Sequence, residues 1–269
     1  MALQLLLIGC GNMGGAMLAG WLQAGLPPQR FAVLDPALEN APDGVALYKD
    51  PQDVPGSHDS VLLGFKPQQL SALAPGLQSL VRDRVALHSL LAGLTLEQLE
   101  VAFPQARAHV RVMPNLAARI NKSPIILAQR GLTKAQRSET RALYDPLGSA
   151  IWLEDESRFD LLTALAGSGP GFVYRFIDAL AQAAIRLGAQ PIEANRLALA
   201  MVEGASGLAA DADVSPAALA DRVASPGGMT REGLDVLDND DALIALLTQT
   251  LEATAKRGEA LSREAAKKT

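Results

Sequence analysis

Residues 3–14 read LQLLLIGCGNMG, an apolar run followed at once by a glycine-rich turn. The apolar run predicts a buried strand over residues 3–8. In the turn, Gly9 permits a tight bend, Gly11 lets the backbone approach a pyrophosphate without a Cβ, and Gly14 lets the following helix pack on the strand. Free amides at the start of that helix hold phosphate oxygens. The spacing therefore predicts a dinucleotide-binding loop formed by Gly9, Gly11, Asn12, Met13 and Gly14.

The same glycines also fit a turn that binds no ligand. The position of the turn, between the first strand and an apolar helix, favours the dinucleotide. Cys10 is then a small filler of the loop and not a nucleophile.

The first half of the chain alternates short apolar runs with helix-like segments, which is typical of βαβ units. A parallel sheet of this kind is covered by helices on both faces, so its strands are buried and apolar. Two of the helices begin with a capping box, in which Thr95 pairs with Gln98 and Thr133 with Gln136. The fold class is predicted to be α/β, with a Rossmann dinucleotide-binding domain over residues 1–157. Later strands are expected at 31–34, 60–65, 85–89, 108–112, 124–127 and 150–153.

An all-helical domain is expected over residues 158–269, where Ala/Leu-rich segments with helical spacing replace the strand patterns. Ser215 followed by Pro216 begins one of its helices, and the final segment, 240–267, begins acidic and ends basic, as the helix dipole prefers. Segment 172–187 (FVYRFIDALAQAAIRL) is apolar around most of its circumference, which a domain of this size cannot enclose alone. We therefore expect this domain to dimerise.

The composition favours a globular protein whose ligand is a small molecule. The formal net charge is -5, with no long run of Lys or Arg, which argues against nucleic acid or a membrane surface as a partner. The apolar start, residues 1–8, is too short for a signal peptide or a membrane span. One cysteine and three scattered histidines predict no metal site, and the lone Cys10 suits a reducing cytoplasm.

Asp35 follows the second strand at about the spacing of a carboxylate that binds the cofactor ribose. No Arg or Lys lies between Arg30 and Lys49 to hold a 2′-phosphate, which favours NADH over NADPH. Alternatively, Asp35 is only a turn residue, because Asp35-Pro36 is a good turn initiator.

Two further segments are expected at the carboxyl edge of the sheet, where open α/β folds bind their ligands. Lys66 and Pro67 follow the third strand, and Pro67 is expected to shape the nicotinamide pocket. Met113, Pro114 and Asn115 take the matching position after the fifth strand. Lys66 could instead be a surface lysine, and Met113-Pro114-Asn115 a simple turn. His88 and His109 lie in predicted strands and are expected to be core residues.

Three segments read together resemble the pyrroline-5-carboxylate reductase family, and the resemblance covers nearly the whole chain. The most specific is 221–234 (DRVASPGGMTREGL), and the second is 167–174 (GSGPGFVY). The third is 111–115 (RVMPN), accompanied by 65–68 (FKPQ). The resemblance implies an NAD(P)H-dependent oxidoreductase of the proline biosynthesis pathway, which transfers a hydride to the C=N carbon of 1-pyrroline-5-carboxylate and gives L-proline. It also implies NADPH or NADH as cofactor and an assembly that is a homodimer or a ring of dimers.

The segment from Ser225 to Thr230 is the expected substrate site. Two glycines before a helix let the backbone approach a ligand, and the helix start offers amides to a carboxylate. By resemblance, Gly227, Gly228 and Met229 belong to the substrate loop, and Thr230 hydrogen-bonds the imine nitrogen, with the hydroxyl of Ser225 beside it. Without the resemblance, the same residues fit a glycine-rich helix start with Thr230 as its N-cap.

The chain departs from the family pattern at three places. Leu116-Ala117-Ala118 stands where the family commonly has Thr-Pro-Ala, which leaves the geometry around the nicotinamide open. Gly171 stands where a small residue such as Ala is common, and Asp35 replaces a 2′-phosphate site, which leaves the cofactor preference open.

Three other functions compete with this interpretation. A β-hydroxyacid dehydrogenase shares the architecture but needs a catalytic lysine on its first long helix of the second domain, and no lysine lies between Lys134 and Lys256. An imine reductase for another cyclic imino acid stays open, because one methylene changes binding by only about 1–3 kcal/mol. A non-catalytic dinucleotide-sensing protein would keep the same fold.

Overall fold

The computed structural model describes residues 4–56 and 58–266. The chain forms two compact units, one that runs up to Ser168 and includes the residues from Thr254 onward, and a second over Gly169–Ala253. The sequence predicts a division into 1–157 and 158–269 from the change between strand and helix patterns. The two compact units are defined in a different way, so this division stays a prediction.

An eight-stranded sheet forms the centre of the first unit, in the order β3-β2-β1-β4-β5-β6-β7-β8. The predicted strands are present with boundary shifts of up to a few residues, and Leu3 of the first one lies outside the described residues. β3 was not predicted, because it has only three residues and its side chains are partly exposed. The strands are β1 (Leu5–Ile8), β2 (Phe31–Leu34), β3 (Ala46–Tyr48), β4 (Ser60–Leu63), β5 (Ala86–Ser89), β6 (Ala108–Met113), β7 (Ser123–Arg130) and β8 (Gly148–Trp152).

The prediction of a parallel sheet is wrong at one strand pair. β7 runs antiparallel to β6, whereas all other neighbouring strands are parallel. The link between them, from Met113 to Ser123, contains only the 3₁₀ helix η5 (Leu116–Ile120). A parallel crossover needs a dozen or more residues, so this short link can only return the chain beside β6 in the opposite direction.

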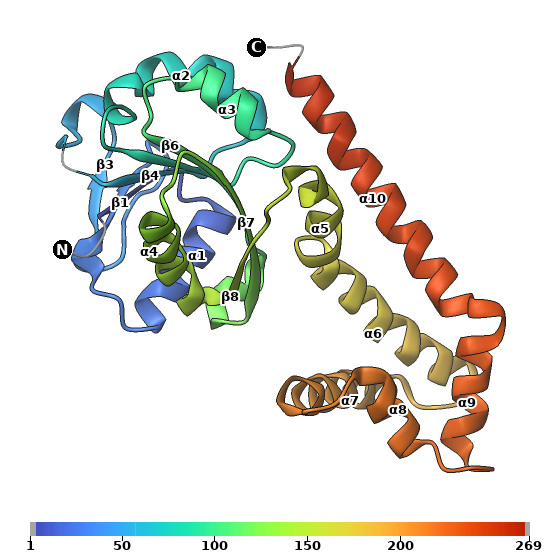
Figure 1. Cartoon of the computed structure of the whole chain (residues 1–269). Helices are drawn as coiled ribbons and strands as arrows, with labels where there is room; N and C mark the ends of the chain where they lie inside the picture. The colour runs from blue at the N-terminus through green and yellow to red at the C-terminus, as the bar shows by residue number, and fades with distance from the viewer. Residues whose placement is uncertain (1–3, 57, 267–269) are drawn as a thin grey trace. The chain divides into compact units, whose positions relative to one another are not determined.

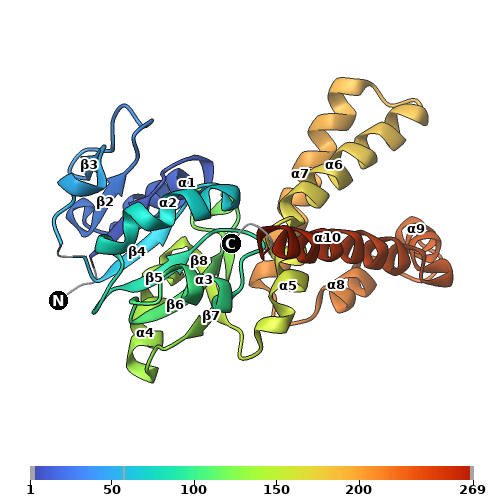
Figure 2. The ribbon, with the colours of Figure 1, turned by 90° about the horizontal axis from the view of Figure 1, so that it is seen from above.

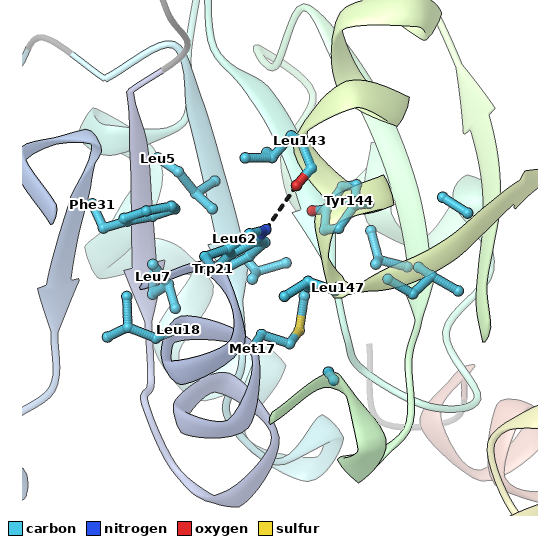
Figure 3. Close-up of a cluster of buried hydrophobic side chains, with 14 of the residues drawn as sticks. Leu5, Leu7, Met17, Leu18, Trp21, Phe31, Leu62, Leu143, Tyr144 and Leu147 are labelled. Atoms are coloured by element: carbon cyan, nitrogen blue, oxygen red, sulfur yellow. Dashed lines mark hydrogen bonds between the residues drawn. The ribbon is translucent and has the colours of Figure 1, made fainter. Parts of the chain in front are cut away.

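Helices cover both faces of the sheet, as predicted, with α2 and α3 on one face and α1 and α4 on the other (Figure 1). Each face has its own buried apolar cluster. In the cluster under α1 and α4, the indole Nε1 of Trp21 donates to Leu143 O at 2.7 Å, which satisfies the one polar atom of a fully buried ring (Figure 3). The helices are α1 (Asn12–Gln23), α2 (Leu70–Leu77), α3 (Leu96–Ala102) and α4 (Lys134–Tyr144).

The capping signals are confirmed. The capping boxes of Thr95 with Gln98 and Thr133 with Gln136 begin α3 and α4. Ser215 accepts from Ala218 N at the start of α8. The final helix begins at Ala242, after a kink at Asp240 with φ 52°, and the expected end at Lys267 lies outside the described residues. The helices that follow β8 are α5 (Phe159–Ala166), α6 (Gly169–Arg186), α7 (Pro191–Asp211), α8 (Pro216–Val223), α9 (Met229–Asp238) and α10 (Ala242–Ala266).

The second unit is helical and has a small core of its own. α6 and α7 pack side by side, as Figure 2 shows, with Ala181, Ala194 and Ala198 buried between them. Many larger apolar side chains of these helices are exposed, including Tyr174 at 68% and Leu197 at 68%. Within residues 4–56 and 58–266, no helix combines the length and the apolar character that a membrane span requires.

Candidate active site

The glycine loop after β1 is packed so tightly that a side chain at either of two of its glycines would force the backbone to shift. Gly9 has φ 87°, and a Cβ there would lie 3.0 Å from Gly64 C and Phe65 N. A Cβ on Gly14 would lie 2.8 Å from Gly9 O. At Gly11, by contrast, a Cβ would meet nothing within 4 Å. The loop is therefore closed against the protein at its two ends and open at Gly11, where a ligand can approach the backbone.

Gly64, at the end of β4, is a residue of this loop that the sequence did not single out. A Cβ there would lie 2.5 Å from Gly9 O. A glycine is needed at position 64 because β1 and β4 are neighbours in the sheet, so the segments that leave their carboxyl ends lie against each other. Only its position after an apolar strand and before Lys66-Pro67 could have suggested it.

A cavity of about 680 Å³ lies at this carboxyl edge, next to the glycine loop. Its wall includes six of the predicted cofactor residues, namely Gly9, Gly11, Asn12, Asp35, Lys66 and Pro67. Pro36, Ala37 and Lys49 also line it, as do apolar groups such as Phe65 and Leu73. A volume of this size suits a sizeable ligand held by apolar walls and a few polar groups.

The geometry fits the pyrophosphate of a dinucleotide. α1 begins at Asn12 directly beside the open face of Gly11, and among the described residues no side chain caps its N-terminus. Its first amides are thus available for an anion, which the helix dipole also favours. The side chain of Met13 packs against the buried cluster and is not part of the cavity wall. The contribution of Met13 and Gly14 to the loop is therefore made through the backbone.

Asp35 connects the glycine loop to the turn after β2. Its Oδ2 accepts from Cys10 N at 2.8 Å, and its Oδ1 accepts from Ala37 N at 2.9 Å. Asp35 therefore stabilises the turn, which by itself does not decide between the turn role and the ribose role. Each carboxylate oxygen has a second lone pair, so these bonds leave acceptor capacity for a ribose hydroxyl.

The Cys10 thiol is kept protonated at neutral pH. Burial, together with the negative charge of Asp35, raises its pKa to about 11. A thiol in this state is a poor nucleophile, in agreement with its predicted role as a loop filler.

Lys66 and Pro67 lie where the sequence predicts, at the end of β4 and in the wall of the cavity. Pro67 begins the 3₁₀ helix η3 (Pro67–Gln69), and Lys66 N donates to Gln69 Oε1 at 3.1 Å. The lysine residue is exposed in the wall of the cavity.

The structure does not bring Met113, Pro114 and Asn115 into the wall of this cavity. Asn115 is buried; its Nδ2 donates to Ala166 O at 2.9 Å, and its Oδ1 accepts from Ala117 N at 2.9 Å. Asn115 thereby fixes the last turn of α5 to the end of β6. This bond to Ala166 is a positioning contact that the sequence could not reveal, since its partner lies 51 residues away.

Arg111, the first residue of the segment 111–115, is a buried cation to which the sequence assigned no role of its own. Its guanidinium contacts Glu156 at 2.9 Å and Asp160 at 3.2 Å, and it lies 3.7 Å from the centre of the Phe159 ring. Glu156 also accepts from Leu96 N at 2.8 Å. This cluster joins the sheet to the first turn of α5, and the buried guanidinium is paired with two partly exposed carboxylates.

His88 and His109 are core residues, as predicted. His88 Nδ1 is hydrogen-bonded to Tyr144 Oη at 2.6 Å, and His109 Nε2 pairs with Phe103 O at 3.0 Å. Both rings are buried and lie outside the cavity at the glycine loop.

The predicted substrate loop, Ser225–Thr230, lies in the second unit and leads into α9. Gly227 has φ 72°, a conformation that favours glycine, and Gly228 N donates to Ser225 O at 2.9 Å. Gly228 is the N-cap of α9, so the alternative in which Thr230 is the N-cap is wrong. Thr230 is the second residue of the helix, and its side chain is exposed.

The start of α9 has the properties of an anion site. Among the described residues no side chain caps it, which leaves its first amides open. Met229, at the first helical position, is 94% exposed. Arg231 is turned back toward α8 by an ion pair with Asp221 at 2.9 Å, which fixes the helix start to the preceding helix.

Sequence comparisons with known proteins point to one family. Residues 156–261 match the family model described as pyrroline-5-carboxylate reductase dimerisation. The chain is 32% identical over 260 residues to pyrroline-5-carboxylate reductase 2 of Bacillus subtilis, covering 93% of this chain and 92% of that protein. It is 29% identical over 263 residues to pyrroline-5-carboxylate reductase of Pseudomonas aeruginosa, covering 96% of each. The solved structure of a pyrroline-5-carboxylate reductase from Coxiella burnetii superposes with a TM-score of 0.90 at 28% identity, covering 97% of this chain and 99% of that one.

Proposed function

The chain belongs to the pyrroline-5-carboxylate reductase family, and we propose that its glycine loop and its Ser225–Thr230 loop bind the two reactants of that family's reaction. The protein is an NAD(P)H-dependent oxidoreductase that acts on an imine and converts 1-pyrroline-5-carboxylate to L-proline in proline biosynthesis. The observation that carries the site assignment is the open cradle at Gly11, which faces a cavity at the carboxyl edge of the sheet.

NADPH or NADH is the cofactor, and when bound it supplies a hydride to the C=N carbon while the π electrons of that bond pass to nitrogen. The chain's own residues orient this cofactor. In the proposal, Gly9 and Gly14 keep the loop closed, the amides at Gly11, Asn12 and Met13 hold the pyrophosphate, and Asp35 accepts from the ribose.

Lys66 and Pro67 are assigned to the pyrophosphate and nicotinamide side of the cavity. Met113, Pro114 and Asn115 do not line this cavity, and we assign them to the nicotinamide end on the resemblance alone. The bond from Asn115 to Ala166 O supports a positioning role for this last residue.

At the substrate, the uncapped start of α9 is assigned to the carboxylate. Gly227, where a Cβ would meet no atom within 4 Å, allows close approach of the backbone, and Met229 borders the loop. Gly228 is needed for a different reason, because a Cβ there would lie 2.6 Å from Ser225 Oγ. Thr230 is assigned to the imine nitrogen, with the Ser225 hydroxyl as a second polar contact. Because an imine can bind already protonated, no strong general acid is required, and Thr230 with a water is sufficient.

The matched family model describes a dimerisation domain, which supports a homo-oligomer. We assign the exposed apolar residues of the second unit to contacts within a homodimer, or within a ring of such dimers. A cytoplasmic location is part of the same proposal and rests on the lone cysteine of the sequence.

The reaction is tested by following absorbance at 340 nm, which reduced nicotinamide loses on oxidation, when the purified protein meets pyrroline-5-carboxylate. Thr230→Ala should bind cofactor normally but lose about tenfold or more in kcat, because one hydrogen bond at the reacting centre is gone. Thr230→Ser, which keeps the hydroxyl, should retain most of the activity. Full activity of Thr230→Ala would remove this residue from the site.

Gly11→Ala is the matched test of the cradle. The φ of -69° at this position suits alanine, and the added Cβ meets no protein atom within 4 Å, so the fold should be unaffected. Cofactor affinity should fall about tenfold or more, because the Cβ occupies the space of the pyrophosphate.

Two results with the unmodified protein would favour the competing functions. Cofactor binding without consumption would identify a dinucleotide sensor. Faster turnover of a six-membered cyclic imino acid would identify an imine reductase for another substrate.

A further inference from the structure

β3 brings Lys49 next to Asp35, although the two residues lie 14 positions apart in the chain. β2 and β3 are parallel and paired from Ala32–Ala46 to Leu34–Tyr48. Asp35 N then donates to Tyr48 O at 3.1 Å, so the pairing continues one step beyond the two strands. Lys49 therefore emerges from the carboxyl edge of the sheet directly beside the predicted ribose carboxylate.

The ammonium of Lys49 lies over the turn that follows β2. Its Nζ donates to Asp35 O at 3.4 Å and to Leu38 O. Within the part of the chain that the structure describes, these partners are neutral carbonyl oxygens and not carboxylates. The positive charge is thus held at the turn without being neutralised by an ion pair.

The cavity at the glycine loop has two lysines in its wall, and they lie at different places. Lys66 follows Gly64, whose neighbour across the sheet edge is Gly9 of the phosphate loop. Lys49 is next to Asp35, where dinucleotide folds hold the ribose of the adenosine. The pyrophosphate is common to NADH and NADPH, whereas only the ribose end differs between them.

We propose that Lys49 is the residue that recognises the 2′-phosphate of NADPH and allows this site to accept both cofactors. This proposal rests on the dinucleotide site described above. A 2′-phosphate on this ribose would bring negative charge near Asp35, and like charges close together repel one another. The ammonium of Lys49 offsets that repulsion and donates charge-assisted hydrogen bonds to the phosphate oxygens.

The sequence suggests a preference for NADH, and the position of Lys49 beside Asp35 weakens the basis for that preference. That preference depends on the absence of Arg and Lys between Arg30 and Lys49, so Lys49 is the first cation after the gap. Counting along the chain places it far from Asp35, whereas the pairing of β3 makes the two neighbours. Asp35 serves NADH through its carboxylate, and Lys49 serves NADPH through its ammonium.

The test compares ligands that differ only in the 2′-phosphate. Dissociation constants of the full-length protein are measured by titration calorimetry for adenosine 2′,5′-bisphosphate against AMP, and for NADPH against NADH. Lys49→Gln should raise the dissociation constants of the two 2′-phosphate ligands about tenfold and those of AMP and NADH less than about twofold. Lys49→Arg should keep the unmodified pattern, because the charge remains.

Lys66→Gln is the matched control, since it removes a lysine from the same cavity. It should change both members of each ligand pair by the same factor. A thermal melt of each variant checks that the turn after β2 is intact. The selectivity of the unmodified protein for 2′-phosphate ligands should also fall between about 50 and 300 mM salt, and that of Lys49→Gln should not.

An equal loss of affinity for both members of a pair in Lys49→Gln would overturn the proposal, because it would show that Lys49 only supports the turn. Unchanged affinities would overturn it as well. A different result, in which the unmodified protein binds neither dinucleotide nor AMP, would contradict the dinucleotide site itself.

Discussion

At the scale of the single residue, His88 is a histidine that the protein keeps uncharged. Its ring is fully buried, Nδ1 is bonded to the hydroxyl of Tyr144 at 2.6 Å, and Nε2 has no partner among the described residues. Burial, with a smaller contribution from the charge of Arg107, lowers its pKa from 6.5 to about 3. The neutral histidine is thus part of the core, and it destabilises the folded protein only when the solution becomes acidic.

The free energy of unfolding should therefore decrease as the pH is lowered below 6.5, the pKa of the histidine in the unfolded chain. Because the folded pKa is lowered, the unfolded chain binds the proton first, so this stability is present above pH 6.5 and is lost as the pH falls toward 3. Between about pH 7.5 and 5.5 this one group accounts for about 1.4 kcal/mol. Urea unfolding at the two pH values measures the difference.

Two variants isolate the contribution of His88. His88→Gln has no ionisable ring and should lose about 1.4 kcal/mol less than the unmodified protein over the same interval. Tyr144→Phe removes the hydroxyl but keeps the histidine, so its dependence on pH should persist. His58, whose pKa is also lowered by burial, is present in every variant and cancels in the comparison. An identical pH dependence in His88→Gln and the unmodified protein would contradict the assignment.

At the scale of the element, the position of α1 is set by one glycine. A Cβ on Gly20 would overlap Ala118 O in η5, and it would also lie 2.8 Å from Leu147 Cδ2. Asn121 Nδ2 donates to Gly20 O at 2.8 Å, which holds the same two segments together. Since α1 begins at the phosphate loop, this contact also positions the first amides of the dinucleotide site.

Gly20→Ala should destabilise the protein by about 1–3 kcal/mol, because the helix must move away from η5 to admit the methyl group. Gly76→Ala in α2 is the control, since a Cβ at this exposed glycine would meet no atom within 4 Å. It should leave the stability unchanged or raise it by about 0.5–1 kcal/mol. Urea unfolding of both variants makes the comparison, and equal effects of the two substitutions would argue against the close contact.

At the scale of the whole molecule, the second unit carries apolar side chains that its own core does not cover. Leu197, Met201 and Leu208 of α7 share one helix face by their spacing, with exposures of 68%, 51% and 74%. In α6 only Ala181 is buried, and Tyr174 is 68% exposed. Exposed apolar area on this scale marks a surface for association.

Replacing Leu197 and Leu208 together by Glu should therefore disrupt the assembly, because two charges would be buried at the expected contact. Sedimentation velocity should show a larger species for the unmodified protein and a smaller one for the double variant. Val101→Glu is the control, since Val101 is 67% exposed but lies on α3 of the first unit. A stable monomer of the unmodified protein would contradict the expected homo-oligomer.

Much of the fold could be predicted because the signals are local. The buried strands, the capping boxes at Thr95 and Thr133 and the cap at Ser215 each depend on neighbouring residues in the chain. The candidate dinucleotide site was predictable for the same reason, since the glycine loop is one continuous segment. The sequence could not predict the contacts of Gly64, Asn115 and Arg111, because their partners are distant in the chain.

The sequence by itself determined the chemistry that each segment can offer: a glycine loop before a helix, a carboxylate after a strand, and a glycine pair before a later helix. Only the tertiary structure decided which of these lie together. A three-residue strand too short to be recognised pairs with β2 and places Lys49 beside Asp35, and a short link turns β7 antiparallel to β6. The physical reason is that strand pairing joins residues through backbone hydrogen bonds between distant segments, so the neighbours that it creates leave no periodic pattern along the chain.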